Sequence, residues 1–220
     1  MRLSLIALVA AIPLLFALTR TPAGASAAPS PLTDDAPTPA RMETAVFAGG
    51  CFWSMEKAFD GLPGVQRATS GFTGGTTVYP SYEESFANPA GHVEAVEVVF
   101  DPDAISYRTL VRHFWHNIDP TVDDRQFCDR GPTYRAALFP QTPAQQRTAE
   151  ASLRQVRARL RQPVVTRIQA AAPFYALGAE HQDFARLHPA RYEQYRRGCR
   201  RDVRLREIWG DAAGTAGANI

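Results

Sequence analysis

The sequence predicts an α+β fold in which helices pack against a mixed β-sheet. Segments with strand character alternate along the chain with segments of helical periodicity. The links between the first strands are too short for uniform β-α-β crossovers, which argues against an all-parallel sheet. The chain has 220 residues, of which 45% are hydrophobic and 21% are charged, and this composition is typical of a globular protein with one good core.

The first half of the folded region is expected to contain three strands and one short helix. Residues 44–50 (TAVFAGG) favour a strand that enters a glycine turn. Residues 54–64 (SMEKAFDGLPG) have helical spacing, and the helix is expected to end at Gly61. A second strand follows at residues 65–72 and leads into a long turn-rich loop, GGTTVYPSYEE. Residues 92–100 (HVEAVEVVF) are the clearest strand of the sequence.

The second half is expected to contain two helices and two strands. Ser106 is a suitable N-cap for a helix over residues 107–118. A loop then leads into a strand at residues 135–139. Residues 142–162 form a long polar helix, and a strand follows at residues 164–169. From Ala179 the chain is expected to be helical or irregular.

The amino terminus has the pattern of an export signal. A basic residue precedes an apolar run over residues 3–18, and residues 25–27 (ASA) fit the small-x-small cleavage pattern of a secretory signal peptide. The run is short for a membrane span. Retention of this segment as an uncleaved anchor is the alternative, because Arg20 interrupts the flank.

We therefore expect a signal peptide, a Pro/Ala/Ser-rich linker, one folded domain and a flexible tail, over residues 1–27, 28–43, 44–210 and 211–220. Such a protein is exported, either to a periplasm or out of the cell. We expect a monomer. Nucleic-acid binding is not expected, since the net charge is only +2 and the basic residues are scattered among acidic ones.

The chain has three cysteines, Cys51, Cys128 and Cys199. In an oxidising compartment an odd number leaves at least one thiol unpaired within a monomer. The wide spacings and the lack of a C-x-x-C motif argue against a zinc site and against a thioredoxin-type motif, so no metal or cofactor is expected. One structural disulfide plus one buried cysteine is a possible arrangement.

Cys51 is placed at or just before the first turn of the predicted helix that begins near residue 54. The unpaired N–H groups and the dipole of a helix start favour a thiolate over a thiol. Phe52 and Trp53, which follow it, are expected to belong to the core by residue type. Two consecutive aromatic residues on one turn cannot both face the same core, however, so one of them is expected to line a pocket around the thiol.

Glu94 is expected to share a strand face with three apolar side chains. Strand parity places it with Val96, Val98 and Phe100, while Glu97 points to the opposite face. A carboxyl group on an apolar face has a raised pKa and can remain a proton donor at neutral pH. The alternative is that Glu94 lies at the strand end and points to water.

Two other functions are consistent with these residues. Any of five histidines could serve as the base of a cysteine hydrolase that uses Cys51, although no spacing singles one out: His92, His113, His116, His181 and His188. Alternatively, the domain is not an enzyme and is stapled by a Cys128–Cys199 disulfide.

Five motifs occur in order along the domain, GGCFW, GFTGGTTVYPSYEE, GHVEAVEVVFDP, DRQFCDRGPTYRAAL and AEHQDF. Together they closely resemble the A-type peptide methionine sulfoxide reductases, over residues 44–209. The resemblance implies a two-layer α/β sandwich with a mixed central sheet and flanking helices. It also implies reduction of methionine-S-sulfoxide, free or in proteins, and hence repair of oxidised exported proteins.

The resemblance implies that Cys51 is the nucleophile and that Glu94 protonates the sulfoxide oxygen. A sulfoxide sulfur is a poor electrophile until its oxygen is protonated, so a nucleophile and a neutral acid must meet at one site. The reaction leaves a sulfenic acid on Cys51 and releases methionine.

The other site residues also follow from the resemblance. Tyr82 and Tyr134 match tyrosines that hydrogen-bond the sulfoxide oxygen, and Asp129 matches a further residue of the site. Phe52 and Trp53 match the cage around the methyl group of the substrate.

Renewal of the thiol requires a second cysteine and an external reductant. A thiol must condense with the sulfenic acid to give a disulfide, which a thioredoxin-like dithiol would then reduce. Better-known members carry the resolving cysteine in a glycine-rich tail, but the tail of this chain has none. Cys199, in YRRGCRRD, resembles the resolver of a subgroup with the pattern Y-R-x-x-C-x-R, and its arginines should lower the pKa of its thiol. Cys128 is the alternative resolver.

Overall fold

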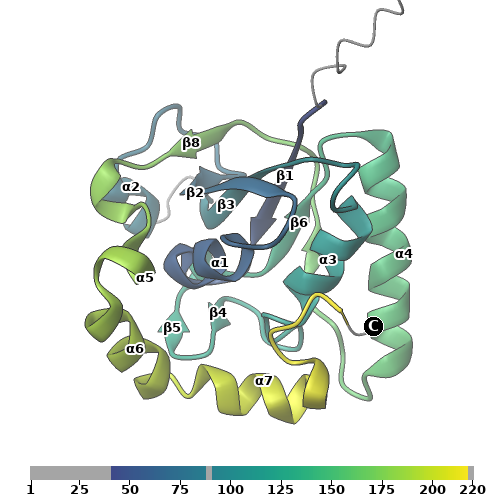
Figure 1. Cartoon of the computed structure of the whole chain (residues 1–220). Helices are drawn as coiled ribbons and strands as arrows, with labels where there is room; N and C mark the ends of the chain where they lie inside the picture. Colours follow the sequence, from purple (N-terminus) through teal and green to yellow (C-terminus); the bar gives the residue numbers. More distant parts are fainter. Residues whose placement is uncertain (1–40, 88–90, 218–220) are drawn as a thin grey trace, which may run out of the picture. The chain divides into compact units, whose positions relative to one another are not determined.

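The protein is built on a six-stranded mixed sheet with the order β7-β6-β1-β3-β2-β8 (Figure 1). Its structure, a computed structural model, describes residues 41–87 and 91–217, so the predicted signal peptide and most of the linker lie outside the described residues. The strands of the sheet are β1 (Glu43–Ala48), β2 (Val65–Thr73), β3 (Val93–Phe100), β6 (Ala137–Phe139), β7 (Arg167–Ile168) and β8 (Phe174–Ala176). Only the β6–β7 pair is parallel within this sheet, which confirms the predicted mixed sheet.

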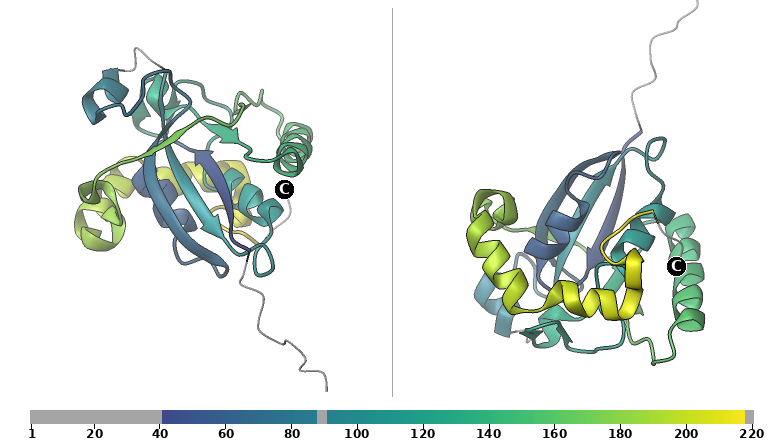
Figure 2. Two further views of the ribbon diagram at one scale, coloured as in Figure 1. Left: turned by 90° about the horizontal axis from the view of Figure 1, so that it is seen from above. Right: turned by 60° about the horizontal axis from the view of Figure 1, so that its bottom comes forward.

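Helices pack on this sheet and continue around one end of it (Figures 1 and 2). They are α1 (Phe52–Phe59), α2 (Tyr82–Ala87), α3 (Tyr107–Trp115), α4 (Pro143–Arg159), α5 (Phe184–Leu187), α6 (Pro189–Gly198) and α7 (Arg201–Trp209). Short 3-10 turns cover Pro132–Tyr134, Ala179–His181 and Gly210–Ala212. The α+β class with flanking helices is confirmed.

Three small features were not predicted: the strand β8, a short hairpin and the helix α2. A hairpin of two-residue strands, β4 (Arg125–Gln126) and β5 (Asp129–Arg130), forms where only a loop was expected. The helix α2 occupies the end of the segment expected to be a loop. The sequence contains the S-x-x-E pattern of a helix start at Ser81 and Glu84, which form a capping box. The Glu84 N–H donates to Ser81 Oγ (3.2 Å), and the Ser81 N–H donates to Glu84 Oε2 (2.8 Å).

The main core lies between one face of the sheet and the helices. Phe47 of β1 and Val96 and Val98 of β3 face it, and they pack with Met55 of α1 and Phe114 of α3, all fully buried. The alternate residues of the same strands form a second, smaller cluster on the opposite face. The predicted parity of β3 is therefore confirmed, and the face that holds Val96 is the face against which α1 packs.

The turn between β1 and α1 requires its two glycines. Gly50 has a φ of +81°, and a Cβ atom added there would collide with the side chain of Gln126. At Gly49 an added Cβ would lie 2.5 Å from the Met55 sulfur. Gln126 cannot easily move, because it is fully buried and its amide bonds both the N–H (2.9 Å) and the carbonyl (2.8 Å) of Asp119. The glycine turn therefore packs directly against Gln126 of β4.

The described part of the carboxyl-terminal tail contacts the end of α3. These residues belong to the segment over 211–220 for which a flexible tail is predicted. The Gly214 N–H donates to the His116 carbonyl (2.8 Å), His116 Nδ1 lies 2.9 Å from the Thr215 carbonyl, and Arg112 Nε donates to the Ala216 carbonyl (2.7 Å). The tail is thus bound by one carbonyl that the helix end leaves open and by two side chains of the same region.

Within the described ranges, every helix is too short or too polar to cross a lipid bilayer.

The close approach of Gly50 can be measured as a difference between two substitutions. Gly61 has nearly the same φ, +80°, but an added Cβ there would meet nothing within 4 Å. Gly61→Ala should therefore lower the free energy of unfolding by about 1 kcal/mol through backbone strain alone. Gly50→Ala should cost about 1–3 kcal/mol more, because it also overpacks Gln126. Urea denaturation of both variants measures this difference. An equal loss in the free energy of unfolding would contradict the close contact between Gly50 and Gln126.

Candidate active site

Cys51 lies at the junction of β1 and α1. Cys51 is the N-cap residue of α1, and its carbonyl oxygen accepts hydrogen bonds from the N–H groups of Ser54 (3.0 Å) and Met55 (3.2 Å). Its side chain is only 6% exposed, and it is a free thiol. The predicted position of this cysteine at a helix start is confirmed.

Glu94 reaches the same helix end from β3. Its side chain is buried, and Oε2 accepts a hydrogen bond from the Phe52 N–H at 2.9 Å. Phe52 is the first residue of α1, so an N–H group that the helix cannot satisfy is directed at the carboxyl group. The alternative that Glu94 points to water is therefore wrong.

The environment of Glu94 keeps it protonated. Burial raises the pKa of this carboxyl to about 8, although the hydrogen bond from Phe52 acts in the opposite direction. The charge of Asp129 adds to the increase. Glu94 is therefore a neutral acid at pH 7, as the apolar strand face predicts.

The thiol of Cys51 is not the ready thiolate that the helix start predicts. Burial, followed by the charge of Glu94, raises the pKa of Cys51 to about 12, while the Tyr195 hydroxyl and the Ser54 N–H act in the opposite direction. The prediction of a lowered pKa is wrong because the desolvation of a buried thiolate outweighs the helix dipole. Below about pH 8 Glu94 is largely neutral, so the repulsion from its charge is largely removed.

Two tyrosines and an aspartate are grouped around this pair. Tyr82 of α2 and Tyr134 of the Pro132–Tyr134 turn both interact electrostatically with Cys51, Glu94 and Asp129. Burial, followed by the charge of Glu94, raises the pKa of both tyrosines, so their hydroxyl groups stay protonated. The structure thus brings together five predicted site residues that come from four separate elements and the β1–α1 turn.

The two aromatic residues after Cys51 diverge, as predicted. Phe52 is buried in the main core, where it meets the edge of Phe72 with ring centroids 6.1 Å apart. Trp53 is half-buried and stacks on Phe184 of α5, with centroids 3.6 Å apart and an interplanar angle of 6°. His181 meets Phe52 edge-on at 5.5 Å, so the surroundings of the site are mainly aromatic.

Tyr195 is a site residue that sequence reasoning missed. It lies on α6, its hydroxyl donates to Asp129 Oδ2 at 2.6 Å, and it also hydrogen-bonds the Cys51 sulfur. Its ring meets Trp53 edge-on, with centroids 6.4 Å apart. A signal was available, because Tyr195 begins the motif YRRGCRRD and stands four residues before Cys199, which is one turn on a helix.

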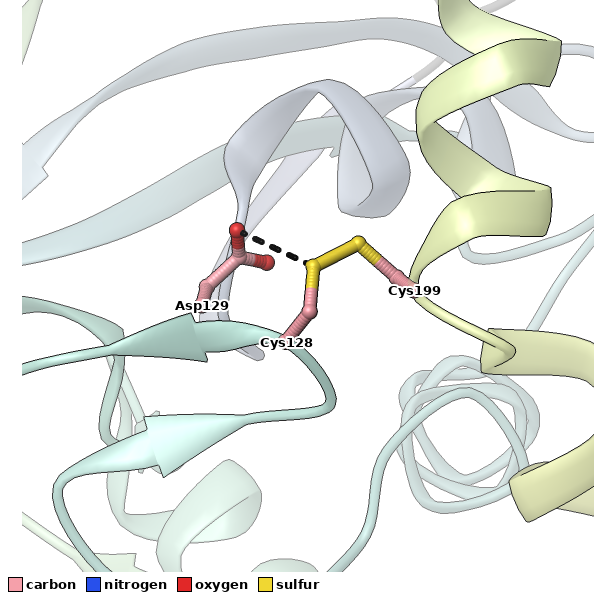
Figure 3. Close-up of side chains that lie close together, drawn as sticks. All are labelled: Cys128, Asp129 and Cys199. Atoms are coloured by element: carbon pink, nitrogen blue, oxygen red, sulfur yellow. Dashed lines mark hydrogen bonds between the residues drawn. A yellow bond between two sulfur atoms is a disulfide. The ribbon is translucent and has the colours of Figure 1, made fainter.

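The two candidate resolving cysteines are bonded to each other. Cys128, in the β4–β5 turn, forms a disulfide with Cys199 at the end of α6, with a Cα–Cα distance of 4.9 Å. The Cys128 sulfur lies 3.9 Å from Asp129 Oδ1. Figure 3 shows this carboxylate beside the disulfide. Cys128 is exposed, whereas Cys51 is buried. The Cys128 and Cys199 sulfurs and an Asp129 carboxylate oxygen lie within 4.8 Å of one another, but both sulfurs are bonded to each other in the disulfide.

The histidines do not support a cysteine hydrolase. Three of them bond main-chain carbonyls: His92 to Thr77 (3.0 Å), His113 to Ala58 (2.6 Å) and His116 to Thr215 (2.9 Å). The other two pack on aromatic rings, His181 on Tyr82 and His188 on Phe184. Among the described residues, no hydrogen bond joins a histidine to Cys51, so the base that a hydrolase needs is not in place.

The arrangement fits one kind of chemistry. A thiol, a neutral carboxylic acid and protonated hydroxyl groups meet in an aromatic, buried setting. Such a site can attack one atom of a polar bond while it protonates the other atom.

Comparison with known proteins agrees with this chemistry. Residues 43–213 match the family described as peptide methionine sulfoxide reductase. A peptide methionine sulfoxide reductase (MsrA 2) of Caulobacter vibrioides is 46% identical over 171 residues, which cover 77% of this chain and 87% of that protein. The enzyme MsrA of Bacillus subtilis is 45% identical over 172 residues, covering 77% and 97%. The solved structure of methionine sulfoxide reductase A of Corynebacterium diphtheriae is 30% identical, with a TM-score of 0.61, and the match covers 70% of this chain and 77% of that one.

Proposed function

Because this chain belongs to the peptide methionine sulfoxide reductase family and reduces methionine-S-sulfoxide to methionine, we propose that Cys51 and Glu94 carry out the reaction. The observation that supports this assignment is the hydrogen bond from the Phe52 N–H to Glu94 Oε2. This hydrogen bond holds the protonated Glu94 carboxyl group at the start of α1, where Cys51 is the N-cap residue. Nucleophile and acid therefore approach the two atoms of one S=O bond from fixed positions.

The first half of the reaction transfers oxygen from the substrate to Cys51. Glu94 donates its proton to the sulfoxide oxygen while the Cys51 sulfur attacks the sulfoxide sulfur. This attack forms a bond between the Cys51 sulfur and the substrate sulfur. The protonated oxygen then moves to the Cys51 sulfur while the S–O bond of the substrate and the new S–S bond both break, which leaves a sulfenic acid on Cys51 and releases methionine. The thiol proton of Cys51 restores the proton on Glu94, so one thiol and one sulfoxide give one sulfenic acid and one methionine.

The remaining predicted residues position the substrate. Tyr82 and Tyr134 keep their protons and can donate hydrogen bonds to the oxygen as negative charge develops on it. Phe52 and Trp53 supply aromatic surface for the methyl group. Asp129 receives the hydrogen bond of Tyr195, whose hydroxyl also bonds the Cys51 sulfur.

The acid role of Glu94 can be tested by single-turnover kinetics. Glu94→Gln should slow methionine formation by about 10²–10⁴-fold with little change in substrate binding, because the proton is needed in the transition state. The wild-type rate should also fall as the pH rises through about 8, where Glu94 loses its proton, and the variant should lack this fall.

Glu97→Gln is the matched control, since Glu97 lies on the same strand but on the opposite face and is half-buried. It should react at the wild-type rate. An unchanged rate for Glu94→Gln would exclude the acid role.

Cys51 needs a relay for its renewal, because the buried sulfur is inaccessible to a large reductant. We propose that the Cys199 thiol condenses with the sulfenic acid, forming a Cys51–Cys199 disulfide and releasing water. The Cys128 thiol then attacks the Cys199 sulfur. This exchange frees the Cys51 thiol and leaves the Cys128–Cys199 disulfide, of which Cys128 is exposed.

The local charges support this order. Cys199 stands among arginines, which favour its thiolate, and it remains the proposed resolver. Cys128 stands beside the Asp129 carboxylate, which disfavours a thiolate there. An external thioredoxin-like dithiol would reduce the final disulfide, with Cys128 as the exposed sulfur that it attacks.

Methionine yield and disulfide mapping test the relay. Fully reduced protein, freed of reductant and given excess methionine-S-sulfoxide, should form two methionines per chain, because the freed Cys51 thiol can react again. Cys128→Ser should form one and hold a Cys51–Cys199 disulfide. Cys199→Ser should form one and keep a sulfenic acid on Cys51 that dimedone labels.

Cys51→Ser is the control and should form no methionine. One methionine per wild-type chain would make Cys128 a bystander. A Cys51–Cys128 disulfide in wild type after one turnover, with Cys199 free, would contradict the assigned order.

We also propose that the protein is exported and that residues 1–27 are removed. The apolar run and the ASA site support export, and an oxidising compartment is compatible with an exposed disulfide. Full-length protein expressed in a bacterium with a periplasm should be recovered there with Ala28 as its first residue. Protein that stays with the membranes and begins at Met1 would support the uncleaved anchor instead.

A further inference from the structure

Arg201 is a buried cation that the reaction described above does not use. It is the first residue of α7, two positions after Cys199, and is only 1% exposed. Nη2 donates to the Asn117 carbonyl (2.6 Å) and lies 3.7 Å from the Met55 sulfur. The guanidinium carbon lies 4.2 Å from the centroid of the Phe127 ring.

Most of the hydrogen-bonding capacity of this guanidinium is unused. Its Nε and Nη1 atoms are buried and have no hydrogen-bond partner. Within the described ranges, no carboxylate oxygen lies within 4 Å of the Arg201 guanidinium, although Arg196 pairs with Asp202 and Arg204 pairs with Asp119 and Glu207. Burying an unpaired cation and unpaired N–H groups is costly. A buried cation of this kind is expected to have a negative group nearby in some state of the protein.

The surroundings of Arg201 identify that group. Met55, which it contacts, is one helical turn after Cys51 on α1. Arg201 also interacts electrostatically with Tyr195 and Tyr192 and, more weakly, with Cys51, and its charge acts to lower the pKa of Asp129. Cys51 is the member of this group that must become more negative when it attacks the substrate.

The other titratable groups around Cys51 supply no positive charge. The titratable groups that face the thiol from the packed elements are Glu94 of β3, Asp129 of β5, Tyr195 of α6, Tyr82 of α2 and Tyr134 of the 3-10 turn. All of these are neutral or negative. Arg196, which lies near Arg201, is engaged by Asp202 and by the Tyr192 hydroxyl.

We propose that Arg201 is the buried counter-charge of the Cys51 thiolate, a positioning residue that favours the anion on the sulfur from beneath the first turns of α1. The inference deepens the proposed role of Cys51 and rests on it. Burial and the neighbouring acid disfavour the thiolate, and a fixed cation nearby offsets part of that effect. The alternative is a purely structural role, in which Arg201 only binds the end of α3 and stacks on Phe127.

Alkylation of Cys51 separates these roles without any turnover. In the oxidised protein Cys128 and Cys199 are bonded, so Cys51 is the single free thiol of the chain. Its reaction with iodoacetamide, followed by intact mass from pH 7 to 10, reports the thiolate fraction. Arg201→Met should react about tenfold more slowly at each pH, because losing a nearby cation raises a thiol pKa by about one unit.

Two further variants keep the test decisive. Arg201→Lys keeps the charge but loses the planar stacking, and it should react within about twofold of wild type. Arg204→Met removes a neighbouring arginine on α7 that pairs with Asp119 and Glu207, and it should leave the alkylation rate unchanged. An unchanged rate in folded Arg201→Met, or an equal loss in Arg201→Lys, would overturn the proposal. Methionine formation, measured separately, decides the proposed function whatever the alkylation rates are.

Discussion

The hydrogen bond between the Phe52 N–H and Glu94 Oε2 is the interaction on which the site depends. It joins the first turn of α1 to a strand in the interior of the sheet. The carboxyl group gains a donor that the helix cannot use, and it remains buried with a raised pKa. Because Cys51 directly precedes Phe52, the same contact fixes the thiol relative to the acid. Gly49 and Gly50 allow the turn to come close enough for this contact.

The burial of Cys51 has two opposite consequences. It keeps water and oxidants away from a sulfenic acid, which protects that state from further oxidation. It also raises the pKa of the thiol and keeps large reductants away from it. The Cys128–Cys199 pair, in which Cys128 is exposed, can carry electrons between Cys51 and a large reductant, because it lies beside Asp129, whose partner Tyr195 hydrogen-bonds Cys51. A buried site can then exchange electrons with a partner that never enters it.

The corner between α6 and α7 is held by more than the disulfide. The Arg204 Nε donates to the buried Asp119 carboxylate at 2.7 Å, and Arg201 binds the Asn117 carbonyl. The Gln126 amide bonds the main chain of Asp119, and the Gln126 side chain also supports the glycine turn before Cys51. These contacts do not require the sulfur–sulfur bond. The segments that carry Cys128 and Cys199 can therefore stay in register when the disulfide is reduced, which a repeated redox cycle requires.

The sequence by itself determined the strands and helices with strong periodicity, the position of Cys51 at a helix start and the parity that places Glu94 on an apolar face. Local patterns suffice for these features, since strand and helix periods are properties of neighbouring residues. The ordered motifs also identified the family. Short strands such as β4, β5 and β8 were not predicted, because a segment of two or three residues shows too little periodicity. Such a strand forms only where a partner strand is present.

Only the tertiary structure decided the protonation of the thiol, the pairing of the cysteines and the roles open to Tyr195 and Arg201. Phe52 and Glu94 are 42 residues apart and the bonded cysteines are 71 apart, so their contacts depend on how distant segments pack. The pKa of Cys51 was mispredicted for the same reason. A helix start favours a thiolate locally, but the surrounding fold excludes the water that would stabilise the charge, and this desolvation is the larger effect.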